Sequence, residues 1–157
     1  MNDQHVRKQL INALTRQQAH QLFDDVVKDF PAEHYNTRPN NVPYTFWHLI
    51  EHIRIAQWDI LDYIVNPDYA YRDFPAGYWP DPSAIANEVA WQHTINSFRT
   101  DLQALVDIIN DPQTDLYAQI PHAQPGHTIL REINIVATHN AYHIGELGIL
   151  RGVMGLW

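Results

Sequence analysis

The sequence contains no cysteine. This absence excludes disulfides, thiolate metal ligands and a cysteine nucleophile, so any thiol chemistry needs a thiol supplied from outside the chain. Basic residues are also scarce, because ten Lys and Arg stand against 18 Asp and Glu, for a net charge of −8. A nucleic-acid groove and an anionic membrane patch both need clustered positive charge, so the sequence predicts neither a nucleic-acid nor a membrane partner.

Long apolar runs are missing too. There is no uninterrupted apolar stretch of about 18 residues, and the opening MNDQHVRKQL lacks the apolar core of a signal peptide. We therefore expect a cytoplasmic protein. The length of 157 residues suits one domain, 1–157, and a hydrophobic content of 45% with five Trp predicts a globular core.

Apolar residues recur at helical spacing along most of the chain, and no segment alternates as a strand does. The expected helices cover 3–16, 23–30, 44–66, 82–110 and 128–154. The first two read as one helix with a break and a shorter continuation, and Asp81-Pro82 reads as the start signal of the fourth segment. The connection of about 16 residues at 67–82 can cross a bundle from end to end. The sequence thus predicts an all-α four-helix bundle with a long crossover between its second and third helices.

Two histidines fall within the apolar stripe of the last expected helix. They are His139 and His143, one turn apart. The other members of the stripe are Ile129, Val136, Leu147, Leu150 and Met154. A buried imidazole without a partner costs about 1–3 kcal/mol, and a metal ion would satisfy both rings. On the second long helix His52 lies at the edge of the apolar face and is the third candidate ligand, whereas His48 lies further toward the outside.

The spacing alone also admits hydrogen-bonded core or interface histidines, since random placement gives roughly 0.6 pairs at i,i+4. Two named metal sites are excluded. Asn140, not Glu, follows His139, which rules out the zincin motif, and no Asp or Glu lies three residues before any His, which rules out a ferritin-like di-iron site. Three imidazoles on one ion leave a coordination position open for water or substrate, as in catalytic sites.

Two carboxylates lie near these histidines. Glu146 is three residues after His143, and Glu132 is seven before His139. Each is a candidate for a hydrogen-bond partner of a ligand, an extra ligand or a general base, with an ordinary salt bridge as the alternative. Glu146 ranks first as the catalytic candidate because it lies within one turn of a ligand.

The stretches PYTFWHLIEHIRIAQWDIL and GHTILREINIVATHNAYHIGEL resemble the second-helix and fourth-helix motifs of the DinB-like family, and the resemblance covers nearly the whole chain. It implies up-down-down-up connectivity, a homodimer, and a divalent metal, often Ni or Zn, held by His52, His139 and His143. Some relatives are S-transferases or isomerases that use low-molecular-weight thiols, and many others have no assigned activity.

Three functional hypotheses follow. In the first, the protein is a metal-dependent enzyme that activates a low-molecular-weight thiol or water for transfer to a small electrophile, as an S-transferase, isomerase or hydrolase. In the second, it is a non-enzymatic dimeric bundle with a structural or vestigial His–metal site. Sensing of a small molecule by binding alone is a third, less favoured hypothesis.

Overall fold

The computed structural model describes residues 3–157, which form five α-helices and two 3₁₀ turns. These are α1 (Gln4–Thr15), α2 (Phe23–Val27), η1 (Ala32–His34), α3 (Phe46–Val65), η2 (Ala76–Tyr78), α4 (Glu88–Asn110) and α5 (Ile129–Val153). Residues 3–157 contain no strand, only one bridge pair between Gln119 and Thr128. The all-α prediction is confirmed. The finer prediction of four helices in up-down-down-up order stays a prediction, since α1 and α2 are separate helices.

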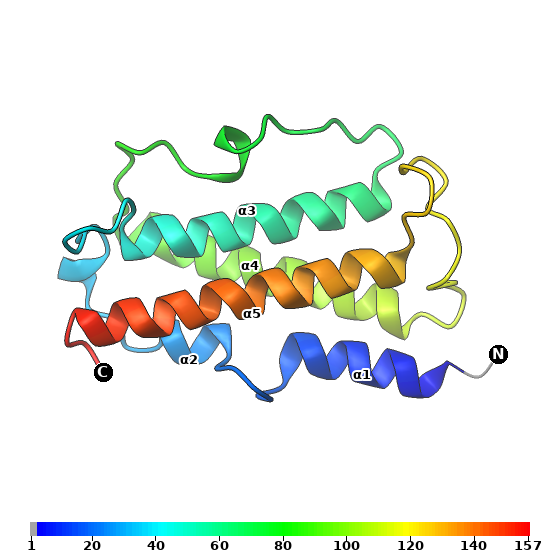
Figure 1. Ribbon diagram of the computed structural model, residues 1–157, viewed down its shortest axis with the longest axis horizontal. Coiled ribbons are helices and arrows are strands. Elements are labelled where there is room, and N and C mark those ends of the chain that lie inside the picture. The colour runs from blue at the N-terminus through cyan, green and yellow to red at the C-terminus, as the bar shows by residue number, and fades with distance from the viewer. Residues whose placement is uncertain (1–2) are drawn as a thin grey trace.

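The three long helices pack side by side, with α3 in contact with both α4 and α5. Figure 1 shows α1 and α2 end to end below α5, and it shows residues 66–87 returning along the length of α3. We call this segment, 66–87, the crossover. It contacts α3 through η2, so both sides of α3 are covered by other parts of the chain. None of the helices in residues 3–157 is long and apolar enough to cross a membrane.

The helix after the crossover begins later than predicted. Asp81 and Pro82 lie in a turn, where the Asp81 carboxylate accepts from the Ser83 backbone N–H at 2.7 Å and so makes an Asx turn in place of a helix cap. The cap is Asn87, whose side chain accepts from the Ala90 N–H. Ile85 therefore lies before the helix and Val89 in its first turn, and their side chains are 78% and 77% exposed.

A buried cation on α5, Arg151, binds the end of α2 and the residue that follows it. Arg151 is 6% exposed, and its guanidinium donates to the backbone carbonyls of Val26, Lys28 and Leu156 at 2.7–3.0 Å. The guanidinium also lies 4.8 Å from the centre of the Trp157 ring. Backbone carbonyls thus satisfy a charge that would otherwise be costly to bury.

Candidate metal site

The structure brings three histidines from two helices together at one point. His52 on α3 and His143 on α5 have their Nε2 atoms 3.1 Å apart, and the Nε2 of His139 lies 3.2 Å from that of His52. One ring nitrogen from each of the three lies within 4.8 Å of the others. Residues separated by 87 and 91 positions therefore converge as the histidine pattern predicted.

The outward nitrogens of two of these rings are fixed by acceptors. His52 Nδ1 lies 2.7 Å from the backbone carbonyl of Tyr78, and His143 Nδ1 lies 2.6 Å from a Glu146 carboxylate oxygen. Neither a carbonyl nor an ionised carboxylate donates a proton, so both imidazoles carry their proton on Nδ1. In the neutral form of both rings, the Nε2 lone pairs face each other, which is unfavourable without a cation between them.

The distances between these nitrogens suit a tetrahedral ion. Nitrogen ligands at the usual distance of about 2.0–2.1 Å from Zn²⁺ in a tetrahedral site lie about 3.3 Å from one another, close to the observed 3.1 and 3.2 Å. The donor set of neutral imidazoles also suits borderline divalent metals. The cluster could therefore hold a divalent metal ion.

Burial keeps two of the rings neutral, which is the form that binds metals. Burial is the main cause that lowers the pKa of His52. Burial, followed by the neighbouring His143 and His52, lowers the pKa of His139 to about 4. Both rings therefore offer a free lone pair at neutral pH.

Aromatic side chains support one side of the site. The Trp79 ring stacks on His52 with centroids 3.9 Å apart and planes 2° from parallel, and Tyr44 stacks at 5.3 Å from Trp79. This stacking holds the His52 ring in place and shields one of its faces from water. Nothing in the sequence singles out Tyr78 or Trp79, because the crossover has no periodic pattern to show which of its residues face α3.

The two candidate carboxylates have different surroundings. Glu146 is the hydrogen-bond partner of His143, as one of its expected roles required. Glu132 is 3% exposed and accepts from Arg131. It lies seven residues, about 10 Å, from His139 along α5. Glu132 therefore belongs to a separate cluster, where it forms the salt bridge that was the alternative to a role beside the histidines.

His48 is buried, contrary to the prediction that it points further outward. It is 3% exposed, its Nε2 lies 2.9 Å from the Ala84 carbonyl, and its Nδ1 accepts from the Thr45 N–H at the start of α3. The crossover covers this side of α3, which a helical wheel does not show. Both nitrogens of His48 thus have hydrogen-bond partners, and the ring is not part of the three-histidine group.

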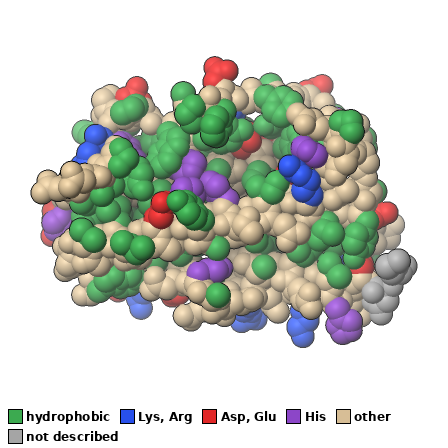
Figure 2. Space-filling view, viewed as in Figure 1, with side chains coloured by type: hydrophobic (Ala, Val, Ile, Leu, Met, Phe, Trp, Pro, Cys, Tyr) green, Lys and Arg blue, Asp and Glu red, His purple; other side chains and the backbone are tan. Residues whose placement is uncertain are grey.

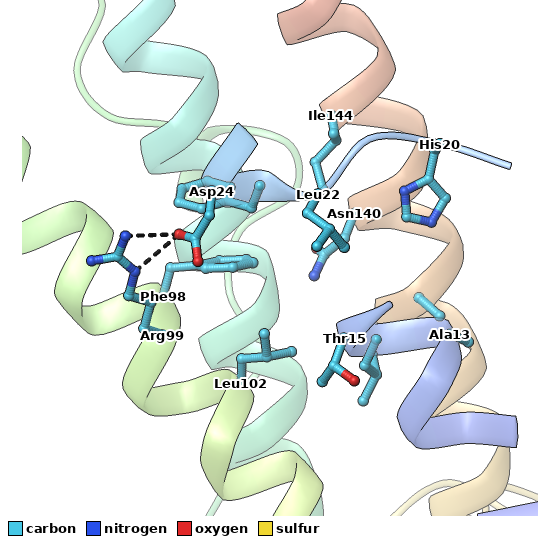
Figure 3. Close-up of a pocket in the computed structure, with 13 residues that line it drawn as sticks. Ala13, Thr15, His20, Leu22, Asp24, Phe98, Arg99, Leu102, Asn140 and Ile144 are labelled. Carbon is cyan, nitrogen blue, oxygen red and sulfur yellow. Dashed lines mark hydrogen bonds and ion pairs between the residues drawn. The ribbon is translucent and has the colours of Figure 1, made fainter. Parts of the chain in front are cut away.

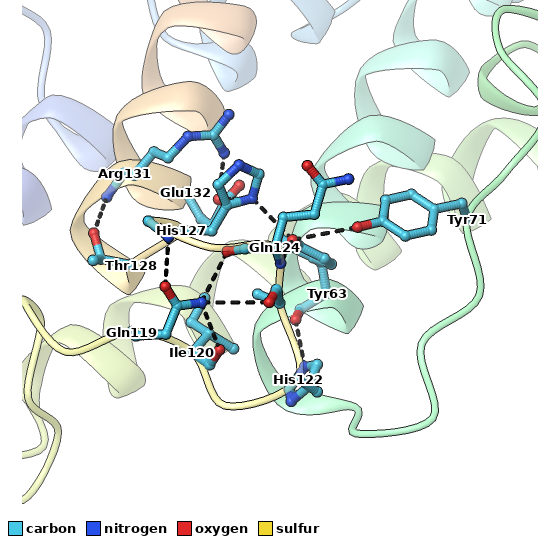
Figure 4. A network of polar contacts seen from close by, with 12 residues as sticks. Tyr63, Tyr71, Gln119, Ile120, His122, Gln124, His127, Thr128, Arg131 and Glu132 are labelled. Carbon is cyan, nitrogen blue, oxygen red and sulfur yellow. Dashed lines mark hydrogen bonds and ion pairs between the residues drawn. The ribbon is translucent and has the colours of Figure 1, made fainter.

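A cleft of about 580 Å³ opens from the histidines and runs between α3, α5 and the crossover. Figure 2 shows histidine side chains in the middle of this face with hydrophobic side chains around them. At the end of the cleft away from the three histidines is a polar network (Figure 4). There, Tyr63 O–H and His127 Nδ1 lie 2.9 Å apart, and Arg131 pairs with Glu132. The cleft gives a small molecule access to the open side of the candidate site.

A second cavity, of about 200 Å³, lies near the break between α1 and α2 (Figure 3). Its charged side chains, Asp24 and Arg99, pair with each other at 2.8 Å, and His20 bonds to the neighbouring Gln21 carbonyl. The group of potential metal ligands found in residues 3–157 is elsewhere. This cavity is therefore not our candidate functional site.

Comparison with known proteins gives one match. Residues 13–147 match the family model described as the DinB superfamily. No curated protein and no solved structure matches the chain. The matched residues include all three histidines, Glu146 and the whole crossover.

Proposed function

This chain belongs to the DinB superfamily, and from that premise we propose that it binds a divalent metal ion, Ni or Zn, through His52, His139 and His143. We further propose that it is an enzyme that activates a low-molecular-weight thiol or water for transfer to a small electrophile. The observation that carries the proposal is the convergence of three imidazole nitrogens beside an open cleft. An ion held there would supply Lewis acidity that favours the ionised form of water or a thiol at neutral pH.

The other residues of the site prepare the three imidazoles. The Tyr78 carbonyl and the Glu146 carboxylate hold His52 and His143 with their Nε2 lone pairs directed at the shared point. A carboxylate on the outer nitrogen also makes an imidazole a stronger ligand. We therefore assign Glu146 a positioning role, since it already accepts from His143.

The remaining elements of the proposal concern assembly. We propose that α1 and α2, which lie end to end in Figure 1, together serve as the first helix of an up-down-down-up bundle in a single domain, 1–157. A homodimer and a cytoplasmic location remain predictions, to be tested by light scattering and by cell fractionation.

Metal content tests the proposal directly. Purified protein should contain, or take up, about one divalent ion per chain when offered Ni, Zn, Co and Fe separately, as measured by elemental analysis. Each of His52→Asn, His139→Asn and His143→Asn should abolish uptake and keep the helical circular dichroism spectrum. The matched control is His93→Asn, because His93 is an exposed histidine on α4. A wild-type protein that binds none of the four metals would refute the proposal.

A second measurement separates the enzyme from the alternative, a non-enzymatic bundle with a structural or vestigial site. An enzyme should conjugate one of several offered thiols to an electrophile, or hydrolyse it, only when it is metal-loaded. A large metal-induced rise in Tm without turnover would instead favour the structural role. The open cleft next to the histidines favours the enzyme, since structural sites are closed by protein ligands.

A further inference from the structure

The polar side chains along the wall of the cleft form hydrogen bonds and ion pairs with one another. Asp59, which is 5% exposed, accepts from the hydroxyls of Tyr69 and Tyr78 at 3.1–3.2 Å. Its carboxylate also lies 3.3 Å from the Arg72 guanidinium. A ligand that needed a hydrogen bond from any of these groups would have to break an existing one.

At the far end of the cleft the polar groups are also paired with one another (Figure 4). Tyr63 O–H accepts from the Gln124 N–H at 3.0 Å and shares a hydrogen bond with His127. Glu132 neutralises Arg131, so an anion gains little from that cation. A polar or charged ligand therefore meets partners that are already engaged.

Between these two polar groups the cleft wall is apolar. Ile60 on α3 and Ile135 on α5 line it, and the crossover adds Phe74 and Pro75. At the mouth, Phe74 is 87% and Tyr71 63% exposed. Exposed aromatic side chains beside an apolar cleft leave apolar surface in water, and an apolar ligand would cover it.

From this pairing of the polar groups we infer that the substrate of the cleft is a neutral, mainly apolar organic molecule with an aromatic ring, whose reactive end lies at the three histidines. The inference rests on the proposed function. The volume of about 580 Å³ lies within the usual range for small-molecule sites. Sugars, phosphates and charged amino acids are disfavoured, because their polar groups would be desolvated without new partners.

Binding of a neutral fluorescent dye tests the inference without any enzymatic assay. Nile red is titrated into the full chain, both zinc-loaded and metal-free, and is then displaced by 2-naphthol, naphthalene-2-sulfonate or glucose. We expect the dye to bind both forms, and 2-naphthol to displace it better than the sulfonate does. Glucose should not displace it. Absence of dye binding, or better displacement by the sulfonate or glucose, would overturn the inference.

Variants place the dye in the cleft. Ile135→Asn should weaken dye binding by about 10-fold or more. The control Ile149→Asn changes an isoleucine of the same helix that is 71% exposed and should leave binding unchanged. Phe74→Ser guards against misfolding of the first variant, because Phe74 is so exposed, and it should weaken binding several-fold. Equal binding by wild type, Ile135→Asn and Phe74→Ser would contradict the inference.

Metal uptake measured on the same samples distinguishes the two proposals. Dye binding in the cleft without metal uptake would refute the proposed function but leave the apolar cleft standing. Metal uptake without dye binding would refute the inference about the substrate and leave the metal site standing.

Discussion

Removing the carboxylate behind His143 should weaken metal binding by an amount that the structure allows us to work out. Glu146 accepts from His143 Nδ1 at 2.6 Å, and their side chains are 30% and 13% exposed. A hydrogen bond to a charged group in such a partly buried place contributes about 1.5–3 kcal/mol. Because about 1.4 kcal/mol is tenfold in affinity, its loss should raise the dissociation constant of the metal by about 10–100-fold.

Two substitutions separate the charge from the hydrogen bond. Glu146→Gln keeps an acceptor oxygen for Nδ1–H and loses the charge, so its effect should lie near the tenfold end of that range. Glu146→Ala loses both and should lie near the hundredfold end. The control is Glu88→Gln, a carboxylate in the first turn of α4 that should leave metal affinity unchanged.

The assay is titration with Co²⁺, followed by its visible absorption and by competition with a chelator. The absorption band should also change shape in Glu146→Ala, since a freed His143 ring can rotate. The reasoning is wrong if both Glu146 variants bind Co²⁺ within twofold of wild type, or if Glu88→Gln weakens binding as much as they do.

Three further predictions concern other parts of the molecule. Asp59→Ala should lower both Tm and Co²⁺ affinity, because the Tyr78 hydroxyl loses its acceptor and the crossover loosens, whereas Asp59→Asn should retain most of both. Metal-free protein should lose stability as the pH falls from 6.5 toward 4. The unfolded chain takes up a proton at His139 that the folded chain, with its pKa of about 4, does not bind. Urea unfolding at pH 7 and pH 5 should show a loss of stability of up to about 2 kcal/mol that His139→Asn reduces. Arg151→Met should cost about 2–4 kcal/mol by urea unfolding because the backbone carbonyls of Val26, Lys28 and Leu156 lose their donor. Arg99→Met, at an exposed pair, should cost less than about 1 kcal/mol.

Periodicity predicted the long helices and made His52 a candidate partner of His139 and His143, and the family resemblance implied that the three act together. Two imidazoles one turn apart on a helix face must point the same way, and a third on the edge of a neighbouring apolar face can reach them. The helical periodicity, however, predicted that His139 and His143 lie in the middle of the buried stripe of α5. In the structure Asn140 and Ile144 are buried and both histidines are half-buried, because the open cleft reaches that side of α5.

The path of the crossover and its contacts with α3 could not be predicted from the sequence. Proline-rich connections have no repeating pattern, so nothing indicated that the Tyr78 carbonyl and the Trp79 ring would reach His52. The error at His48 has the same cause. The sequence does not show that the crossover covers the side of α3 on which His48 lies. The late start of α4 has a similar cause, since the turn at Asp81 competes locally with a helix cap for the same side chain.

The acceptor for His52 belongs to the main chain of the crossover, and this has an evolutionary consequence. A peptide oxygen is present whichever amino acid occupies the position, so mutation can replace neighbouring side chains of the crossover without removing the group that orients this imidazole. The same segment forms a wall of the cleft. Selection could therefore remodel ligand preference by substitutions in the crossover away from Tyr78 and Trp79 while the arrangement of the three histidines is inherited unchanged.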